Sequence, residues 1–279
     1  MKQTYPVVLT IAGSDSGGGA GIQADLKTIS ALGAFGTSAI TAVTVQNTLG
    51  VQAIHSIPLD ILKGQIEAVM SDFSVKAIKI GMLDQPEVVS VILDAIVKYH
   101  PPYVVVDPVI VATSGDILIH DQAIDKMKKE LFPFVDLITP NLSEASILLG
   151  RMINDITEMK MAAKLLSSSF GCKSVLIKGG HLFDNTMTDI LWMNKEEQLH
   201  TFSSKKIDTK NLHGTGCSLS SAIATFLAFG ETIPQAVQYA KEYITSAIEC
   251  GQDIMIGHGH GPINHFFKPE TLKKININL

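Results

Sequence analysis

The sequence predicts an α/β fold in which a central, mostly parallel sheet carries helices on both faces, giving three layers. Two observations support this class. Short runs of apolar, β-rich residues alternate with longer segments of helical periodicity, and few polar residues interrupt the runs. Parallel strands that are buried on both faces have this uninterrupted apolar character. Alternation of strand and helix is typical of right-handed βαβ units.

The elements follow in order along the chain. Predicted strands cover residues 7–12, 77–80, 103–106, 135–138 and 174–177. Predicted helices cover residues 22–32, 59–71, 86–99, 121–131 and 159–170, and two more cover 219–229 and 234–250. Pro86 suits a first helical position because its missing N–H has no acceptor there. Residues 187–193 and 198–202 flank a polar turn, which predicts a small hairpin at one edge of the sheet.

Length and composition favour one domain over residues 1–279. Hydrophobic residues make up 46% of the chain, and no linker or repeat divides it. The net charge of −5 argues against a nucleic-acid partner, because phosphate backbones are bound by basic surfaces. The first apolar run is too short for a signal peptide or a membrane span, so we expect a cytoplasmic protein with no membrane partner. Three separated cysteines indicate neither a zinc site nor a disulfide framework.

Loops rich in glycine and polar residues follow the predicted strands repeatedly. They contain the segments 13–15, 81–82, 107–109, 141–144 and 178–181. In an open α/β sheet, ligands bind outside the carboxyl ends of the strands. The sequence therefore predicts a single active site along that edge.

Residues 208–217, with the sequence DTKNLHGTGC, immediately precede a helical apolar pattern. A helix N-terminus offers free N–H groups and a dipole charge of roughly +0.5, which suits a phosphate or a developing oxyanion. Cys217 lies at this terminus, where a thiol pKa is expected to be lowered. Its role is either that of a nucleophile or base, or that of a small helix-cap residue.

Other motifs in these loops each allow two interpretations. The glycines of 17–21 either form a simple turn or let a ligand approach the backbone. Asp25 is either an exposed acid in a first helical turn or a pocket residue that accepts from a ligand amine. Asn141 and Glu144 have the spacing of a capping box, and their oxygens would equally suit magnesium. Lys178, at a strand end, either meets solvent or reaches a polyphosphate.

Taken together, the motifs resemble the hydroxymethylpyrimidine and phosphomethylpyrimidine kinases of thiamine biosynthesis, in the ribokinase-like superfamily. The resemblance runs essentially end to end. It rests on TIAGSDSGGGAGIQADLKT at 10–28, KIGML at 79–83, DPV at 107–109, ITPNLSEA at 138–145, KGGH at 178–181 and DTKNLHGTGC at 208–217.

The resemblance implies a ribokinase-like fold and transfer of the ATP γ-phosphoryl group to a hydroxymethylpyrimidine and then to its monophosphate. It implies that Cys217 occupies the base position, within an anion hole formed by Gly214, Thr215, Gly216 and Cys217. The implied magnesium-organising residues are Asn141, Glu144 and Asp107. The implied ATP-binding residues are Lys178, Asp107, Thr209 and His213. The implied pyrimidine pocket contains Asp25, Gln46, Met82 and, through its backbone, Val109.

Gln46 departs from the glutamate that many relatives carry in this segment, so it brings no charge to the pocket. The nearest alternative function is that of a pyridoxal or pyridoxine kinase, whose substrate is also an aromatic ring with a hydroxymethyl arm. A noncatalytic binding protein has no need of the implied phosphate-binding residues. Superfamily relatives are often dimers, so we expect a homodimer.

Overall fold

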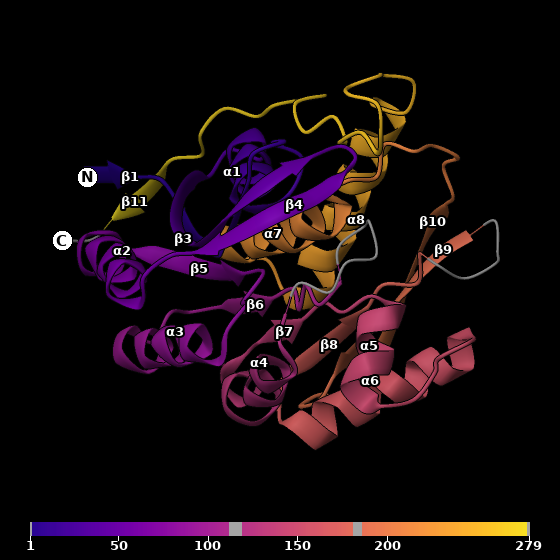
Figure 1. Ribbon diagram of the computed structural model, residues 1–279, viewed down its shortest axis with the longest axis horizontal. Helices are drawn as coiled ribbons and strands as arrows, with labels where there is room; N and C mark the ends of the chain where they lie inside the picture. The colour runs from indigo at the N-terminus through magenta and orange to yellow at the C-terminus, as the bar shows by residue number, and fades with distance from the viewer. Residues whose placement is uncertain (1, 112–118, 181–185, 278–279) are drawn as a thin grey trace.

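The computed structural model describes residues 2–111, 119–180 and 186–277. Its centre is a nine-stranded sheet with the strand order β10-β9-β8-β7-β6-β5-β2-β3-β4 (Figure 1). The strands from β8 to β3 in this order run parallel, and antiparallel strands extend the sheet at both edges. The predicted α/β class with a mostly parallel sheet is confirmed.

The sheet has six parallel strands, and all of them except β3 agree with the predicted apolar runs, with some shifts at their ends. They are β2 (Val7–Asp15), β3 (Phe35–Asn47), β5 (Val75–Ile80), β6 (Val104–Val106), β7 (Leu137–Ile138) and β8 (Ser174–Ile177). Successive side chains of a strand point to opposite faces. In β6, Val104 and Val106 accordingly pack into one core, whereas Val105 packs into the other. Burial on both faces explains why these runs contain so few polar residues.

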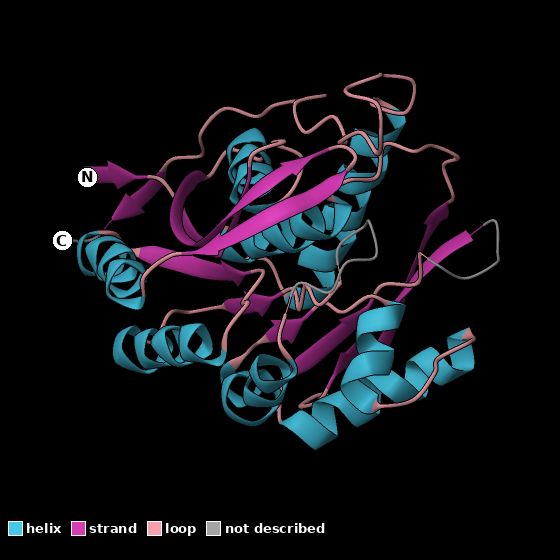
Figure 2. Cartoon of the chain, in the orientation of Figure 1, coloured by secondary structure: helices cyan, strands magenta, loops and turns pink. Residues whose placement is uncertain are grey.

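Helices cover both faces of the sheet, which gives the predicted three layers (Figure 2). One face carries α2 (Leu59–Asp72), α3 (Pro86–Tyr99), α4 (Asp121–Lys126), α5 (Leu142–Leu149) and α6 (Ile156–Phe170). The other face carries α1 (Gly21–Ala31), α7 (Thr215–Ala228) and α8 (Ile233–Glu249). Beyond α4 the chain continues as the π-helix η1 (Met127–Leu131) and the 3₁₀-helix η2 (Phe132–Phe134), so the predicted helix 121–131 is only partly α-helical.

The two edges of the sheet differ in how well the sequence predicted them. The expected hairpin is present as β9 (Thr186–Met193) and β10 (Gln198–Lys205). At the opposite edge, β3 pairs with β4 (Gly50–Ser56) in a second hairpin that was not predicted. A separate two-stranded sheet pairs β1 (Lys2–Thr4) with β11 (Ile275–Ile277), so the two ends of the described chain lie together (Figure 1). No helix within the described ranges is long and apolar enough to cross a membrane.

Candidate active site

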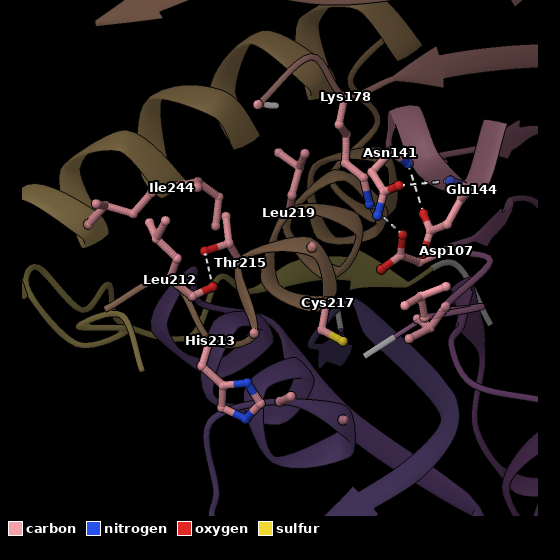
Figure 3. Close-up of a pocket in the computed structure, with 18 of the residues that line it drawn as sticks. Asp107, Asn141, Glu144, Lys178, Leu212, His213, Thr215, Cys217, Leu219 and Ile244 are labelled. Atoms are coloured by element: carbon pink, nitrogen blue, oxygen red, sulfur yellow. Dashed lines mark hydrogen bonds and ion pairs between the residues drawn. The ribbon is translucent and has the colours of Figure 1, made fainter. Parts of the chain in front are cut away.

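A cavity of about 470 Å³ opens at the carboxyl ends of the parallel strands. Its walls come from the loops after β2, β5, β6, β7 and β8 and from the first turn of α7. This is the edge at which the sequence predicted a single site. In Figure 3, Asp107, Asn141, Glu144 and Lys178 gather on one side of Cys217, and Leu212, Leu219 and Ile244 lie on the other.

The turn that the sequence predicted to bind an anion, here called the anion-binding turn, begins at Gly214, which is the N-cap of α7 and has a φ of 80°. A Cβ at this position would lie 1.8 Å from the carbonyl oxygen of Gly19, so only glycine fits. The N–H groups of Gly216 and Cys217 fall in the first helical turn, where no intrahelical acceptor exists. The helix begins at Thr215, four residues before the predicted helical pattern, and this places the whole turn against the cavity.

Lys178 and Asp107 form an ion pair on the wall of the cavity, with 2.7 Å between Nζ and Oδ1. Thr139 donates to the same carboxylate oxygen at 3.1 Å. Burial opposes the charge of Lys178, but the neighbouring carboxylates of Asp107 and Glu144 raise its pKa above the ordinary value. A Cβ built on Gly216 would lie 3.2 Å from the Lys178 ammonium and 3.4 Å from Asp107 Oδ2. The pair therefore faces the anion-binding turn directly.

Asn141 and Glu144 form the capping box of α5. The Asn141 side chain accepts from the Glu144 N–H at 2.9 Å, and the Glu144 carboxylate accepts from the Asn141 N–H at 2.8 Å. Burial raises the pKa of Glu144 to about 7; Lys178 opposes this rise and the Asp107 carboxylate adds to it. The capping interpretation is thus confirmed. The capping box also holds the Glu144 carboxylate near that of Asp107.

These two carboxylates suit a magnesium ion, which favours carboxylate oxygens and keeps several waters. Burial, and to a smaller extent the Asp107 carboxylate, raises the pKa of Glu144, and a bound cation would favour its charged form. Within the described ranges, no cluster of three histidine, cysteine or acidic side chains could enclose a metal. An ion held here would therefore rely on water and substrate oxygens as well.

Cys217 lies half-buried in the wall of the cavity. Burial raises the pKa of its thiol to about 11, although the Lys79 ammonium lowers it. The prediction that the helix N-terminus depresses this pKa is wrong. Burial is the largest cause of the raised pKa, and the Asp25 and Asp107 carboxylates raise it further because they also disfavour a thiolate.

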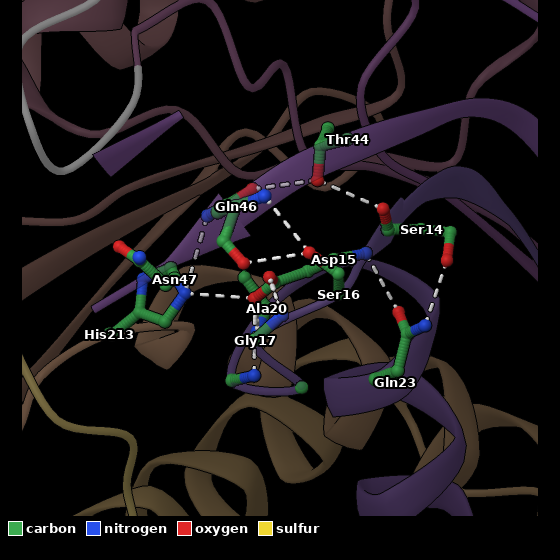
Figure 4. A network of polar contacts seen from close by, with 12 residues as sticks. Ser14, Asp15, Ser16, Gly17, Ala20, Gln23, Thr44, Gln46, Asn47 and His213 are labelled. Atoms are coloured by element: carbon green, nitrogen blue, oxygen red, sulfur yellow. Dashed lines mark hydrogen bonds and ion pairs between the residues drawn. The ribbon is translucent and has the colours of Figure 1, made fainter. Parts of the chain in front are cut away.

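His213 was predicted to bind ATP, but its ring faces a different part of the cavity. The Nε2 atom lies 2.9 Å from Asp15 Oδ2 and 3.4 Å from the amide nitrogen of Gln46 (Figure 4). Asp15 also accepts from three backbone N–H groups of its own loop, those of Gly17, Gly19 and Ala20. His213 thus contacts Gln46 and Asp15 rather than Lys178 or Asp107. The sequence analysis placed Asp15 in a rim loop but gave it no role.

Met82 and Val109 line the cavity together with Gln46, as predicted for an aromatic-ring pocket. The N–H of Val109 already donates to the Asp107 carbonyl at 2.8 Å. A backbone contact from Val109 to a ligand would therefore come from its carbonyl oxygen.

Two predicted binding residues do not line the cavity. Asp25 is fully buried beneath it, where its carboxylate binds Lys79 at 2.9 Å and accepts from Thr10 and Ser221. A buried carboxylate needs such partners. Through them Asp25 links β2, β5 and α7. Thr209 donates to the Gln252 carbonyl at 2.9 Å and lies on a loop outside the cavity. Neither side chain faces the cavity in this structure, contrary to what the sequence analysis expected. His181, of the segment 178–181, lies outside the described residues.

The remaining wall suits an aromatic base and its sugar. It is formed by the apolar side chains of Leu212, Leu219, Ile244 and Ile248. An ion pair between Lys241 and Asp189, 2.6 Å apart, lies at the same end. Asp189 also accepts from the Gly179 N–H at 3.0 Å, which fixes the loop that carries Lys178. The sequence analysis missed this pair because neither residue lies in a recognisable motif.

The fold and the cavity together define a small-molecule kinase of the ribokinase-like class. An anion-binding helix terminus, a lysine and a pair of carboxylates meet on one side of an apolar wall. A model of the phosphomethylpyrimidine kinase family matches residues 15–264, and the chain belongs to this family. The predictions of family, ribokinase-like fold and kinase activity are confirmed.

Relatives of known activity agree with this assignment. The hydroxymethylpyrimidine/phosphomethylpyrimidine kinase of Rhizobium meliloti is 46% identical, covering 94% of this chain and 97% of the relative. The bifunctional thiamine biosynthesis protein ThiED of Geobacter sulfurreducens is 47% identical over 95% of this chain. This chain spans only 53% of that longer protein.

Two solved structures show the same fold. The crystal structure of phosphomethylpyrimidine kinase from Clostridium difficile is 44% identical, with a TM-score of 0.77, and covers 87% of this chain and 99% of that chain. An ADP complex of pyridoxal kinase from Bacillus subtilis is 33% identical, with a TM-score of 0.86, over 94% and 98% of the two chains. Backbone similarity alone does not separate the two activities, whereas sequence identity is higher to the pyrimidine kinase.

Proposed function

We propose that residues 1–279 form a single kinase domain that phosphorylates 4-amino-5-hydroxymethyl-2-methylpyrimidine with ATP and then phosphorylates the resulting monophosphate. The arrangement that carries this proposal is the meeting of Lys178, Asp107 and the first turn of α7. The Lys178 ammonium lies 3.2 Å from where a Cβ of Gly216 would be, so a transferring phosphoryl group at this turn would be neutralised by Lys178 and by the N–H groups of the turn. Asp107 would act there through a bound magnesium ion. The names of the relatives supply the substrate.

The chemistry follows from how phosphoryl transfer works. The transition state is loose, and charge spreads over three equatorial oxygens, so alignment and charge neutralisation dominate catalysis. The N–H groups of Gly216 and Cys217 and the Lys178 ammonium would supply fixed positive charge at these oxygens. The hydroxymethyl oxygen attacks the γ-phosphorus while the bond between the γ-phosphorus and the ADP oxygen breaks, and the hydroxyl proton passes to an oxygen of the transferred phosphoryl group and then to water. Base catalysis contributes little to such a loose transition state. This agrees with the Cys217 thiol, which is protonated at neutral pH and so adds little as a base.

Asp107 and Glu144 would hold magnesium, with Asn141 keeping Glu144 in place through the capping box. When bound, the ion would neutralise charge on the ATP phosphates. The apolar wall of Leu212, Leu219 and Ile244 would take the adenosine. The ring pocket would be formed by Gln46, Met82 and Val109.

A product assay tests the proposal. The protein is incubated with hydroxymethylpyrimidine, ATP and magnesium, and phosphorylated products are separated over time. We expect the monophosphate first and the diphosphate later. A parallel reaction with pyridoxal tests the alternative, and faster turnover of pyridoxal would overturn the proposed substrate. Omission of magnesium should abolish either reaction.

We further propose that the protein works in the cytoplasm as a homodimer. The β3–β4 hairpin supports a dimer, because β4 is an edge strand and the hairpin exposes Val43, Val45 and Ile54. Exposed edge strands with apolar side chains favour pairing with another chain. Light scattering of the purified protein tests this proposal, and the mass of a monomer at micromolar concentration would contradict it.

A further inference from the structure

A polar network joins the loop after β2 to the tip of β3 and to the anion-binding loop (Figure 4). Its centre is the contact between Asp15, His213 and Gln46, which come from three separate segments of the chain. His213 is held in place from behind, because a Cβ on Gly19 would lie 2.4 Å from its ring. The ring therefore has little freedom to turn away from Gln46.

The protonation of this network is set by Asp15. Although burial raises its pKa, hydrogen bonds from His213 and from the N–H groups of Ala20 and Gly17 lower it below the ordinary value. Asp15 is thus an ionised carboxylate near neutral pH, and a carboxylate can only accept hydrogen bonds. His213 Nε2, at 2.9 Å, must therefore carry a hydrogen and donate it to Asp15.

This assignment has a consequence for the Gln46 amide. With its nitrogen 3.4 Å from a protonated Nε2, two donors face one another. The amide oxygen lies 3.0 Å from Thr44 Oγ1, and this hydroxyl donates its hydrogen to the Ser14 carbonyl oxygen, which lies 3.0 Å from Oγ1. Half a turn of the amide about its last bond exchanges its two ends. The oxygen then accepts from His213, and the nitrogen donates to Thr44.

We propose that Asp15 and His213 act as positioning residues that fix this direction of the Gln46 amide, so that the ring pocket offers a hydrogen-bond donor to an unprotonated ring nitrogen. One amide hydrogen is used on Thr44, and the contacts of the described residues leave the other for a ligand in the cavity that Gln46 lines. This inference rests on the proposed function, because it names what that pocket recognises. A glutamate at this position could only accept, and would favour a protonated ring.

A double-mutant cycle tests whether His213 acts through Gln46. His213→Phe keeps a ring against Gly19 but loses the donor. In the otherwise unchanged protein we expect this variant to raise KM for the pyrimidine about tenfold, the loss of one hydrogen bond, with kcat and KM for ATP nearly unchanged. In a Gln46→Ala background the same change should alter KM less than about twofold. An equal effect in both backgrounds overturns the inference.

Two variants guard against a purely structural effect. His213→Gln restores a donor and should bring KM back to within about threefold of the original value. Leu212→Ala, one residue away on the apolar wall, should raise KM for ATP and leave KM for the pyrimidine unchanged. If His213→Phe instead raises KM for ATP, the original assignment of His213 to the nucleotide is restored and the inference fails. Thermal melting identifies any variant that is unfolded.

The pH dependence of Gln46→Glu tests the recognised form of the ring. For the original protein, KM should rise as the pH falls through the pKa of the pyrimidine itself, measured by its ultraviolet spectrum. For Gln46→Glu, KM should fall over the same range. The same direction in both proteins overturns the inference.

Calorimetric binding of the pyrimidine without ATP gives these dissociation constants independently of turnover. Absence of phosphorylation together with binding that follows the cycle therefore contradicts the proposed function alone. Phosphorylation of the pyrimidine without energetic coupling between His213 and Gln46 contradicts this inference alone.

Discussion

Lys178 and Asp107 form an ion pair of 2.7 Å even though they follow β8 and β6, which are separated by β7 in the sheet. The pair bridges the carboxyl ends of three neighbouring strands. Thr139, which follows β7, completes the bridge by donating to Asp107. The charge that faces the anion-binding turn is therefore held by the central part of the sheet.

Replacing Lys178 by methionine should lower kcat by at least about 10³-fold, because a fixed charge at the transferring group is lost. The change also leaves Asp107 and Glu144 without their shared cation. Steady-state kinetics at saturating ATP measure the effect. An unchanged kcat with a raised KM for ATP would show that Lys178 contributes only to ground-state binding.

Two glycines of the anion-binding turn should respond differently to alanine. In Gly216→Ala the new Cβ would point at Lys178 and Asp107, 3.2 and 3.4 Å away, into the phosphate position. We expect a folded protein whose kcat falls by about 10²-fold or more. In Gly214→Ala the Cβ would meet the Gly19 carbonyl at 1.8 Å, and the positive φ adds strain, so the fold itself should be lost. Circular dichroism and kinetics on both variants separate the two effects.

The proton on Glu144 should make stability depend on pH in an unusual direction. Its pKa is about 7 in the folded protein, against an ordinary value of 4.5 when unfolded. Because the folded state binds the proton more tightly, the contribution is complete below pH 4.5 and is lost as the pH rises through 7. Its size is on the order of 3 kcal/mol.

Urea unfolding of the original protein and of Glu144→Gln is measured from pH 5 to pH 8. The contribution of Glu144 is the difference between the two proteins in how the free energy of unfolding changes with pH. Magnesium should reduce the loss at higher pH, because it favours the carboxylate. Parallel stability curves for the two proteins would contradict the shifted pKa.

Cys217→Ala should keep more than about a tenth of the original kcat, because a thiol that is protonated at neutral pH adds little as a base. Alkylation by iodoacetamide gives an independent test. Cys217 should react slowly at pH 8 and faster toward pH 11, and prior incubation with the pyrimidine should protect it. A fall in kcat beyond about 10³-fold would instead favour a base role.

Removing the charge of Asp25 should destabilise the protein without acting at the cavity surface. In Asp25→Asn the fully buried Lys79 loses its counterion, which costs about 3–5 kcal/mol in comparable buried pairs. Chemical denaturation measures the loss. The double variant Asp25→Leu with Lys79→Met should recover part of it, since neither charge is then left unpaired. A larger loss in the double variant would contradict this account.

The sequence predicted the buried part of the fold better than its edges. Residues 174–177 were predicted to the residue because burial on both faces makes the run continuously apolar. The β3 strand was missed because it mixes glycine, threonine and serine with apolar residues and is partly exposed along its length. Apolar patterning indicates burial, so it does not reveal a strand whose side chains are exposed at many positions.

For the site, the sequence correctly predicted that Asp107, Glu144 and Lys178 line one cavity, but it misled about the directions of single side chains. Thr209 and His213 share a motif with Gly214, yet Thr209 turns to Gln252 and His213 turns to Asp15. Whether a side chain faces a ligand or a neighbour depends on its direction, which adjacency in a motif does not fix. The prediction of a lowered Cys217 pKa was wrong for a related reason. Burial of the thiol raises this pKa, and the position of Cys217 at a helix terminus does not reveal that burial.

The contact between Gly19 and Gly214 joins loops that lie almost two hundred positions apart along the chain. Because the backbones meet where even a methyl group cannot be inserted, the ring-facing loop and the phosphate-facing turn move as one body. Entry of substrates and departure of the product therefore leave the contact between these two loops unchanged. The distance between the pyrimidine, which accepts the phosphoryl group, and ATP, which donates it, is thus established when the chain folds, before either ligand binds.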